Sequence, residues 1–115
     1  MRPIYKICDR NEWQGAVMAG VYGGSEHDRR DGFIHFSTAR QLAGTLAKHY
    51  AGRSGLLLIA VDTEKLGDTL KWESARDGDL FPHLHASLPV SAVLWSKPIG
   101  LGDDGIHILP DGAEA

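Results

Sequence analysis

The chain reads FIHFSTARQLAGTLAKHYAGRSGLLLIAV over residues 33–61, and this stretch contains a strand, a helix and a second strand. Residues 33–37 alternate between two faces, as they do in a strand. Thr38 and Gln41 then have the spacing of a capping box, which predicts the start of a helix. Residues 55–61 begin with glycine and are otherwise apolar, which predicts a buried strand. The helix is expected to bury Ala39, Leu42, Ala43, Leu46, Ala47 and Tyr50.

Another strand and helix are expected before this stretch. Residues 3–7 read as a short strand, and Asp9 begins a second capping box. The helix that follows is expected to end at Gly20. Residues 20–32 are rich in glycine and charge, which predicts a loop long enough to be functional. The buried face of this helix should carry Trp13, Ala16 and Val17.

Mostly strands are expected after residue 61. Residues 69–73 and 92–99 each read as one strand. Residues 80–88 are apolar, but Pro82 predicts an edge strand or an irregular segment there. The element order therefore predicts an α+β domain in which two helices pack on a small, highly curved or mixed sheet.

The length of 115 residues predicts a single domain, residues 1–115. Its core is expected at about residues 3–99. Residues 100–115 contain four glycines and four acidic residues but no lysine or arginine, which predicts a loose tail. Residues 106–109 within this tail are a candidate for one more strand.

Composition excludes several classes of protein. Cys8 is the only cysteine, so an internal disulfide framework and a cysteine-based zinc cluster are excluded. The net charge of −3 disfavours a nucleic-acid partner. The longest apolar run, residues 56–61, is far shorter than the roughly 20 residues that cross a bilayer, and the N-terminus lacks a signal-peptide pattern. A cytoplasmic protein with no membrane partner is expected, and its oligomeric state is left open.

The first candidate site lies where the strand of residues 33–37 meets the next helix. His35, the hydroxyls of Ser37 and Thr38, and free helix N–H groups should lie close together there. Such a place binds anions or sugar hydroxyls. Helix capping alone would also account for Thr38, and a half-buried strand histidine would account for His35.

The second candidate site involves three residues later in the chain. His83 and His85 should point to the same face if their segment is extended, and two such imidazoles can bind a metal. Metal binding is not the main expectation, because the chain has no cysteine ligand set. Glu73 should face a cleft, as a general base or to orient a sugar hydroxyl, while Trp72 packs in the core. A surface glutamate is the alternative interpretation of Glu73.

The charged loop supplies two more candidates. Arg29 or Arg30 can hold a phosphate or carboxylate at the mouth of a site, although the run of charge from Asp28 to Asp31 is typical of a solvated loop. No role is assigned to the remaining residues with reactive side chains, Cys8, His27, His49 and His107.

Five blocks of the sequence resemble a bacterial family known as domain of unknown function 952 (DUF952), over about residues 3–99. The blocks at Gly32 and Phe81, in this order and separation, are the most specific. The five blocks are Ile4-Tyr5-Lys6-Ile7, Trp13, Gly32-Phe33-Ile34-His35-x-Ser37-Thr38-x-x-Gln41, Trp72-Glu73 and Phe81-Pro82-His83-Leu84.

That family is similar in fold to the ADP-ribosyltransferase-like group, which binds NAD in the cleft of a split, curved sheet. The resemblance implies that His35, with Ser37 and Thr38, holds a ribose, and that Glu73 or His83 acts at the later position. Lys6 stands where the wider group more often has histidine or arginine, and His85 stands where relatives often have tyrosine. NAD is therefore a candidate substrate, and no metal cofactor is expected.

Four functions remain open from the sequence. The first is an enzyme acting on NAD or a nucleotide-sugar, by transferase or glycohydrolase chemistry at the nicotinamide ribose. The second is a module that binds a nucleotide or small anion without turnover. The third is a metal-dependent hydrolase that uses His83, His85 and a further ligand such as His35 or Glu73. The fourth is an interaction domain whose histidines are structural.

Overall fold

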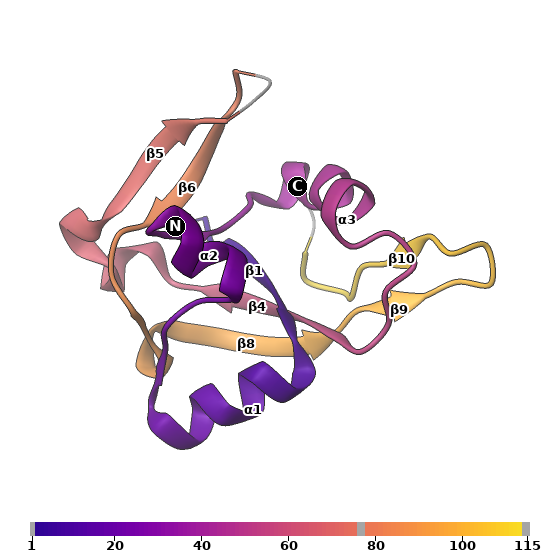
Figure 1. Cartoon of the computed structure of the whole chain (residues 1–115), viewed down its shortest axis with the longest axis horizontal. Helices are drawn as coiled ribbons and strands as arrows, with labels where there is room; N and C mark the ends of the chain where they lie inside the picture. Colours follow the sequence, from indigo (N-terminus) through magenta and orange to yellow (C-terminus); the bar gives the residue numbers. More distant parts are fainter. Residues whose placement is uncertain (1, 76–77, 114–115) are drawn as a thin grey trace.

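The computed structural model describes residues 2–75 and 78–113. Its strands are β1 (Ile4–Asp9), β2 (Val21–Tyr22), β3 (Ile34–His35), β4 (Leu56–Val61), β5 (Leu70–Ser74), β6 (Leu80–Leu84), β7 (Leu88–Pro89), β8 (Val93–Pro98), β9 (Gly100–Leu101) and β10 (His107–Ile108). Its helices are α1 (Arg10–Ala19), α2 (Glu26–Asp31) and α3 (Leu42–His49), as Figure 1 shows. A 3-10 turn, Ala39–Gln41, precedes α3.

The frame consists of two three-stranded antiparallel sheets. One has the strand order β1-β4-β8 and the other the order β3-β6-β5. Two short antiparallel pairs, β2 with β7 and β9 with β10, accompany them. The strands of both sheets are antiparallel and not mixed, and the predicted α+β class is confirmed. So are the strands expected at residues 3–7, 69–73 and 92–99, which are β1, β5 and β8 with ends shifted by one or two residues.

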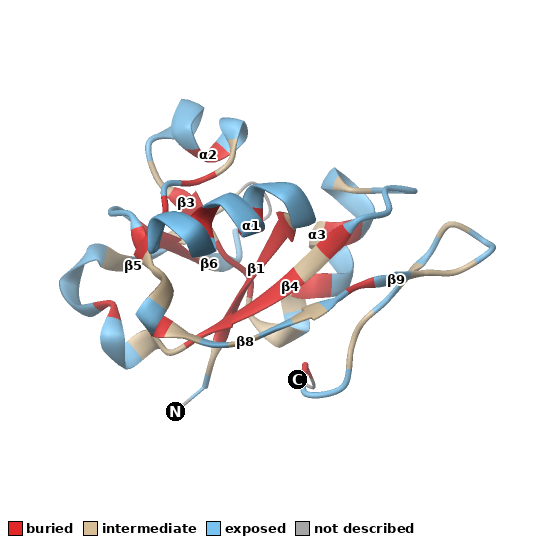
Figure 2. Cartoon of the chain, turned by 90° about the horizontal axis from the view of Figure 1, so that it is seen from below, coloured by how far each residue is buried: buried red, intermediate tan, exposed pale blue. Residues whose placement is uncertain are grey.

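Helices α1 and α3 cover opposite faces of the β1-β4-β8 sheet (Figure 2). Trp13 of α1 belongs to one buried cluster with Ile59, whereas Leu46 of α3 belongs to another with Leu58. Successive residues of β4 therefore face different helices, which explains why the strand is apolar throughout. The prediction of a buried strand at residues 55–61 is confirmed.

The prediction of a loop at residues 20–32 is wrong, because this segment contains β2 and a third helix, α2. Ser25 Oγ accepts a hydrogen bond from the Asp28 N–H at 3.1 Å, and Asp28 Oδ2 accepts one from the Ser25 N–H at 2.9 Å. This reciprocal pair is a capping box that uses aspartate in place of glutamate. Gly32 ends the helix in the left-handed conformation, with φ of 88°.

Three helix positions and one strand position differ from the expected burial. Val17 and Trp72 are about half exposed (51% and 48%), and Ala43 and Ala47 are exposed. Short helices contact the sheet through a narrow stripe, here Trp13 with Ala16 and Leu42 with Leu46, so neighbouring positions turn to solvent. Trp72 lies on the β5–β6 hairpin, which projects from the rest of the chain in Figure 1.

Pro82 lies in β6, the central strand of its sheet, so the predicted edge position is wrong. The Pro82 carbonyl accepts a hydrogen bond from the Phe36 N–H on the side of β3. The nitrogen and carbonyl of one strand residue point to the same side, so the missing N–H of proline costs no bond to β5. Strand β3 has only two residues, which fits a proline beside its end.

The prediction of a loose tail is also wrong for residues 100–113, the part of the tail that the structure describes. β9 and β10 form a hairpin, which confirms the candidate strand at residues 106–109. Tyr5 Oη donates to the Gly112 carbonyl at 3.3 Å, and Lys97 Nζ donates to the Asp111 carbonyl at 2.8 Å. These two bonds tie the tail to β1 and β8. Residues 114–115 lie outside the described residues. No helix within the described ranges is long and apolar enough to cross a membrane.

Candidate functional site

A bridge between the two sheets sets the position of the site. The Tyr5 N–H donates to the Ser37 carbonyl and the Ser37 N–H donates to the Tyr5 carbonyl, both at 2.8 Å. This pairing places β1 beside the residues that follow β3. Lys6 on β1 therefore reaches His35 on β3, and its Nζ donates to the His35 carbonyl at 3.1 Å.

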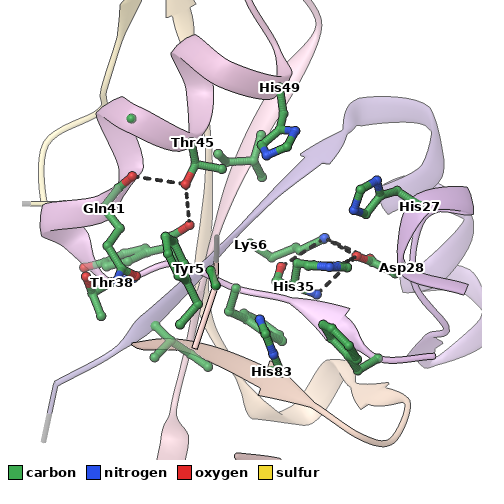
Figure 3. Close-up of a pocket in the computed structure, with 18 of the residues that line it drawn as sticks. Tyr5, Lys6, His27, Asp28, His35, Thr38, Gln41, Thr45, His49 and His83 are labelled. Carbon is green, nitrogen blue, oxygen red and sulfur yellow. Dashed lines mark hydrogen bonds and ion pairs between the residues drawn. The ribbon is translucent and has the colours of Figure 1, made fainter. Parts of the chain in front are cut away.

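Asp28 of α2 joins these two residues into one buried chain (Figure 3). Lys6 Nζ lies 2.8 Å from Asp28 Oδ2 and 3.1 Å from Oδ1, and His35 Nδ1 lies 2.7 Å from Asp28 Oδ1. The side chains of Lys6 and Asp28 are only 4% and 2% exposed, whereas that of His35 is 30% exposed. The chain thus runs from a buried ammonium to an imidazole at the surface.

Asp28 is ionised in this environment. Burial by itself raises the pKa of the carboxyl, but hydrogen bonds from His35 and Lys6 and the charge of Lys6 outweigh it. The pKa of Asp28 therefore lies well below its ordinary range. The N–H groups of Ser25 and His35 also donate to the carboxylate. Because the carboxylate can only accept, His35 Nδ1 donates to it and the ring is held with Nε2 outward.

His35 faces a cleft of about 1780 Å³. The cleft is lined from β1 by Tyr5 and Lys6, from α2 and β3 by acidic and imidazole side chains, and from α3 by hydroxyl and basic side chains. Figure 3 shows the hydroxyl side, with Thr45 beside Gln41, and the imidazole side, with His27 and His49. The lining residues with imidazole side chains are His27, His35, His49 and His83.

A second cluster forms around Glu73. Its Oε1 accepts hydrogen bonds from His83 Nδ1 and His85 Nε2, each at 2.8 Å, so the expectation that the two imidazoles share a face is confirmed. These bonds hold the pKa of the Glu73 carboxyl below its ordinary value. Phe33 stacks on His83 with 4.1 Å between ring centroids and lies 4.6 Å from the His35 ring. Phe33 thereby links the two clusters.

The pKa of His83 is expected to fall further when Glu73 is replaced by glutamine. Burial lowers the pKa of His83, and the hydrogen bond and charge of Glu73 partly oppose this. Glutamine carries no negative charge, so in Glu73→Gln less remains to counter the lowering of the His83 pKa by burial. A pH titration of the imidazole ¹⁵N shifts by NMR measures the change, with the exposed Glu64→Gln as control. An unchanged or higher pKa of His83 in Glu73→Gln would contradict this account.

The structure places the other predicted site residues as follows. Ser37 is buried, and its hydroxyl donates to Thr45 Oγ1 at 3.0 Å because the Thr45 hydrogen is directed to the Gln41 carbonyl. The Thr38 N–H donates to Gln41 Oε1 at 3.0 Å, which is the half of a capping box that Gln41 supplies. Both residues line the cleft, next to His35 along the chain.

The two arginines have separate surroundings. Arg29 Nη1 donates to the Gly24 carbonyl at 3.0 Å, within the segment before α2. Arg30 Nη2 donates to His27 Nδ1 at 3.2 Å and lines the cleft. Three predicted site residues do not line the cleft as the structure describes it: Arg29, Glu73 and His85.

Sequence reasoning missed Asp28, and it assigned no role to His27 and none specifically to Asp31. The spacing of Ser25 and Asp28 was the available signal, since a capping box there predicts a helix and fixes the spacing of residues 27, 28 and 31. His27 Nε2 and His35 Nε2 lie 3.3 and 3.0 Å from Asp31 Oδ2. These three residues offer ligand atoms that all lie within 4.8 Å of one another, and in the part of the chain that the structure describes they are the group that could hold a metal ion.

One comparison identifies a family, and another finds solved structures that are similar to this chain. A family model described as "Protein of unknown function (DUF952)" matches residues 7–96. The crystal structure of protein CC0527 from Caulobacter crescentus has a TM-score of 0.91 and 44% identity, covering 96% of this chain and 97% of that one. The solution NMR structure of the same protein has a TM-score of 0.83 and 45% identity, covering 92% and 91%. A search among curated proteins gave no match.

Proposed function

The chain belongs to the DUF952 family of proteins of unknown function, and we propose that it is an enzyme acting on the nicotinamide ribose of NAD or of a related nucleotide-sugar. The observation that carries the proposal is the chain Lys6–Asp28–His35. A buried, ionised carboxylate holds His35 Nδ1 and turns Nε2 toward the cleft. An imidazole oriented in this way can give or take a proton at Nε2, which is the arrangement of a general acid or base.

The reaction would break the bond between ribose C1′ and the nicotinamide nitrogen. Its electron pair leaves with nicotinamide, which departs as a neutral molecule, and a water or acceptor hydroxyl forms the new bond to C1′. His35 Nε2 takes the proton of that attacking group. The ribose passes through a positively charged oxocarbenium-like state, which a nearby carboxylate stabilises. Asp31, with Oδ2 3.0 Å from His35 Nε2, is such a carboxylate.

Ligand binding has support from the rest of the cleft. Arg30 at the end of α2 and Lys48 at the end of α3 both line it, and they supply positive charge for a pyrophosphate. Thr38 lines the same cleft and has a hydroxyl group suited to a ribose. His83 lines the cleft with its ring centroid 5.4 Å from that of His35, and it is the better candidate for the later position. Glu73 is bound to His83 and His85 and is not among the cleft-lining residues that the structure describes.

The position of Glu73 favours a second candidate function, a module that binds a nucleotide without turnover. The resemblance assigns Glu73 or His83 to turnover at the ribose, whereas the Glu73 carboxylate is engaged by His83 and His85 and is not among the cleft-lining residues that the structure describes. In this case the same cleft binds the nucleotide, and His35 acts as a hydrogen-bond donor or acceptor only.

An NMR titration with NAD, followed by measurement of nicotinamide release by chromatography, tests the proposal. We expect amide shifts at residues 35–41 and in α2, and release of nicotinamide over hours. ADP-ribose, which is NAD without the nicotinamide, should shift the residues near Arg30 and Lys48 but give no nicotinamide. Shifts without release would favour the binding module. No shift at millimolar NAD would overturn both candidates.

A further inference from the structure

We propose that His27, Asp31 and His35 form a binding site for a divalent transition metal, Zn²⁺ in particular, at the edge of the cleft. The inference goes beyond the proposed function and does not depend on it. A metal ion on His35 Nε2 would occupy the atom that acts as the base in that function, so the metal-bound state and NAD turnover exclude each other. His27 and Asp31 are one turn apart on α2, and His35 follows on β3. Two imidazoles and one carboxylate are a common protein ligand set for zinc.

The distances between the ligand atoms suit a metal ion. Asp31 Oδ2 lies 3.3 Å from His27 Nε2 and 3.0 Å from His35 Nε2. Bonds of about 2.0–2.1 Å to a tetrahedral Zn²⁺ place two ligand atoms about 3.3–3.4 Å apart. All three ligand atoms lie within 4.8 Å of one another. Small movements of the exposed His27 and Asp31 side chains therefore bring the three ligand atoms to bonding distance, with one position remaining for water or a ligand oxygen.

The ligands stand on a rigid support. Ser25 caps the start of α2 and Gly32 ends it, so the positions of residues 27 and 31 are fixed relative to each other. Asp28, on the same helix, anchors it to buried Lys6 at 2.8 Å. Asp28 also accepts the hydrogen bond of His35 Nδ1 at 2.7 Å, which leaves Nε2 as the ligand atom. A carboxylate behind a histidine is the usual second partner of metal-binding imidazoles.

His35 Nε2 and Asp31 Oδ2 face each other as two possible ligands of one cation. They lie 3.0 Å apart, and His35 Nδ1 is already held by Asp28, so Nε2 is the ring atom that is directed at Asp31. Lys6 lies against Asp28, not Asp31. A divalent cation would complete the contact and draw in His27 as well.

One existing bond opposes metal binding and provides a sharp control. Arg30 Nη2 donates to His27 Nδ1 at 3.2 Å, which requires the proton of a neutral His27 to be on Nε2. Metal binding at Nε2 releases that proton or moves it to Nδ1, and in the second case Arg30 must turn away. Because Arg30 is exposed, this change is small. Replacing Arg30 by methionine should therefore leave Zn²⁺ binding intact or make it tighter.

Calorimetric titration of the tag-free, metal-stripped chain with Zn²⁺ alone tests the proposal. We expect one Zn²⁺ per chain, and at least a 100-fold loss of affinity in both His27→Ala and Asp31→Asn. The matched control is His85→Ala, which removes an imidazole from the Glu73 cluster and should leave the affinity unchanged. Co²⁺ in place of Zn²⁺ should give the visible absorption of a four- or five-coordinate ion that disappears in His27→Ala.

Three results would overturn the site: no binding of Zn²⁺, binding that survives both His27→Ala and Asp31→Asn, or binding that His85→Ala abolishes. Amide spectra of each variant establish that it is folded. The metal titrations contain no nucleotide, and His27→Ala should still bind NAD. Zn²⁺ binding without any response to NAD would therefore refute the proposed function alone, and a response to NAD without Zn²⁺ binding would refute the metal site alone.

Discussion

Replacing Asp28 by asparagine is expected to lower the free energy of unfolding by about 3–5 kcal/mol, because it leaves the Lys6 ammonium buried without a counter-charge. Lys6 is 4% exposed, and the carboxylate is its ion-pair partner at 2.8 Å. The same change leaves one neutral oxygen, which can accept from the His35 ring or from the Ser25 N–H but not from both as the two carboxylate oxygens do. Urea unfolding followed by fluorescence measures the difference.

Two further variants separate the buried charge from other effects. Asp31→Asn removes a carboxylate whose side chain is 40% exposed, and it should cost less than about 1 kcal/mol. The double variant Lys6→Met, Asp28→Asn removes both charges and should recover much of the stability lost in Asp28→Asn. Equal losses in Asp28→Asn and Asp31→Asn, or no recovery in the double variant, would contradict the role given to this ion pair.

The contribution of Asp28 should depend on pH in a defined direction. Its pKa is lowered on folding, so its stabilisation is complete above the ordinary pKa of an aspartate, about 4, and is lost as pH falls toward the folded value. The difference in stability between the original chain and Asp28→Asn should be constant near neutral pH and narrow below about pH 4.

Replacing His35 by asparagine is expected to reduce the release of nicotinamide from NAD by about 100- to 10,000-fold, because it removes the group that exchanges a proton in the cleft. An asparagine amide can still donate to Asp28 in place of Nδ1, so the buried chain keeps its hydrogen bond. The rate at saturating NAD, measured from pH 5 to 9, is the readout. The original chain should show a pH dependence that His35→Asn lacks.

The control for this prediction is His107→Asn. His107 Nε2 donates to the Arg53 carbonyl at 2.7 Å in the tail, and its loss should leave the rate within about twofold. Amide spectra show whether His35→Asn keeps the fold around Asp28. A folded His35→Asn that releases nicotinamide at the original rate would remove His35 from the mechanism.

The sequence alone was sufficient for the α+β class, the two longer helices and most of the strands. Each of these depends on contacts within a few residues. Thr38 and Gln41 cap the turn before α3, Gly20 ends α1, and the apolar run of β4 reports burial on both faces. The shared face of His83 and His85 follows from the strand period, which is also local. The family followed from five short blocks whose order and separation are visible in the sequence.

Only the tertiary structure placed Lys6, Asp28 and His35 in one chain, since 22 residues separate the first two and 29 separate Lys6 from His35. The sequence pattern at Asp28 is that of a charged loop, and no neighbouring residue in the sequence predicts its ion pair with a lysine of the first strand. Burial of a carboxylate depends on which elements pack around it, and so does the direction of its pKa shift. The exposure of Trp72 has the same origin, because an aromatic strand residue is buried only where another layer covers its face.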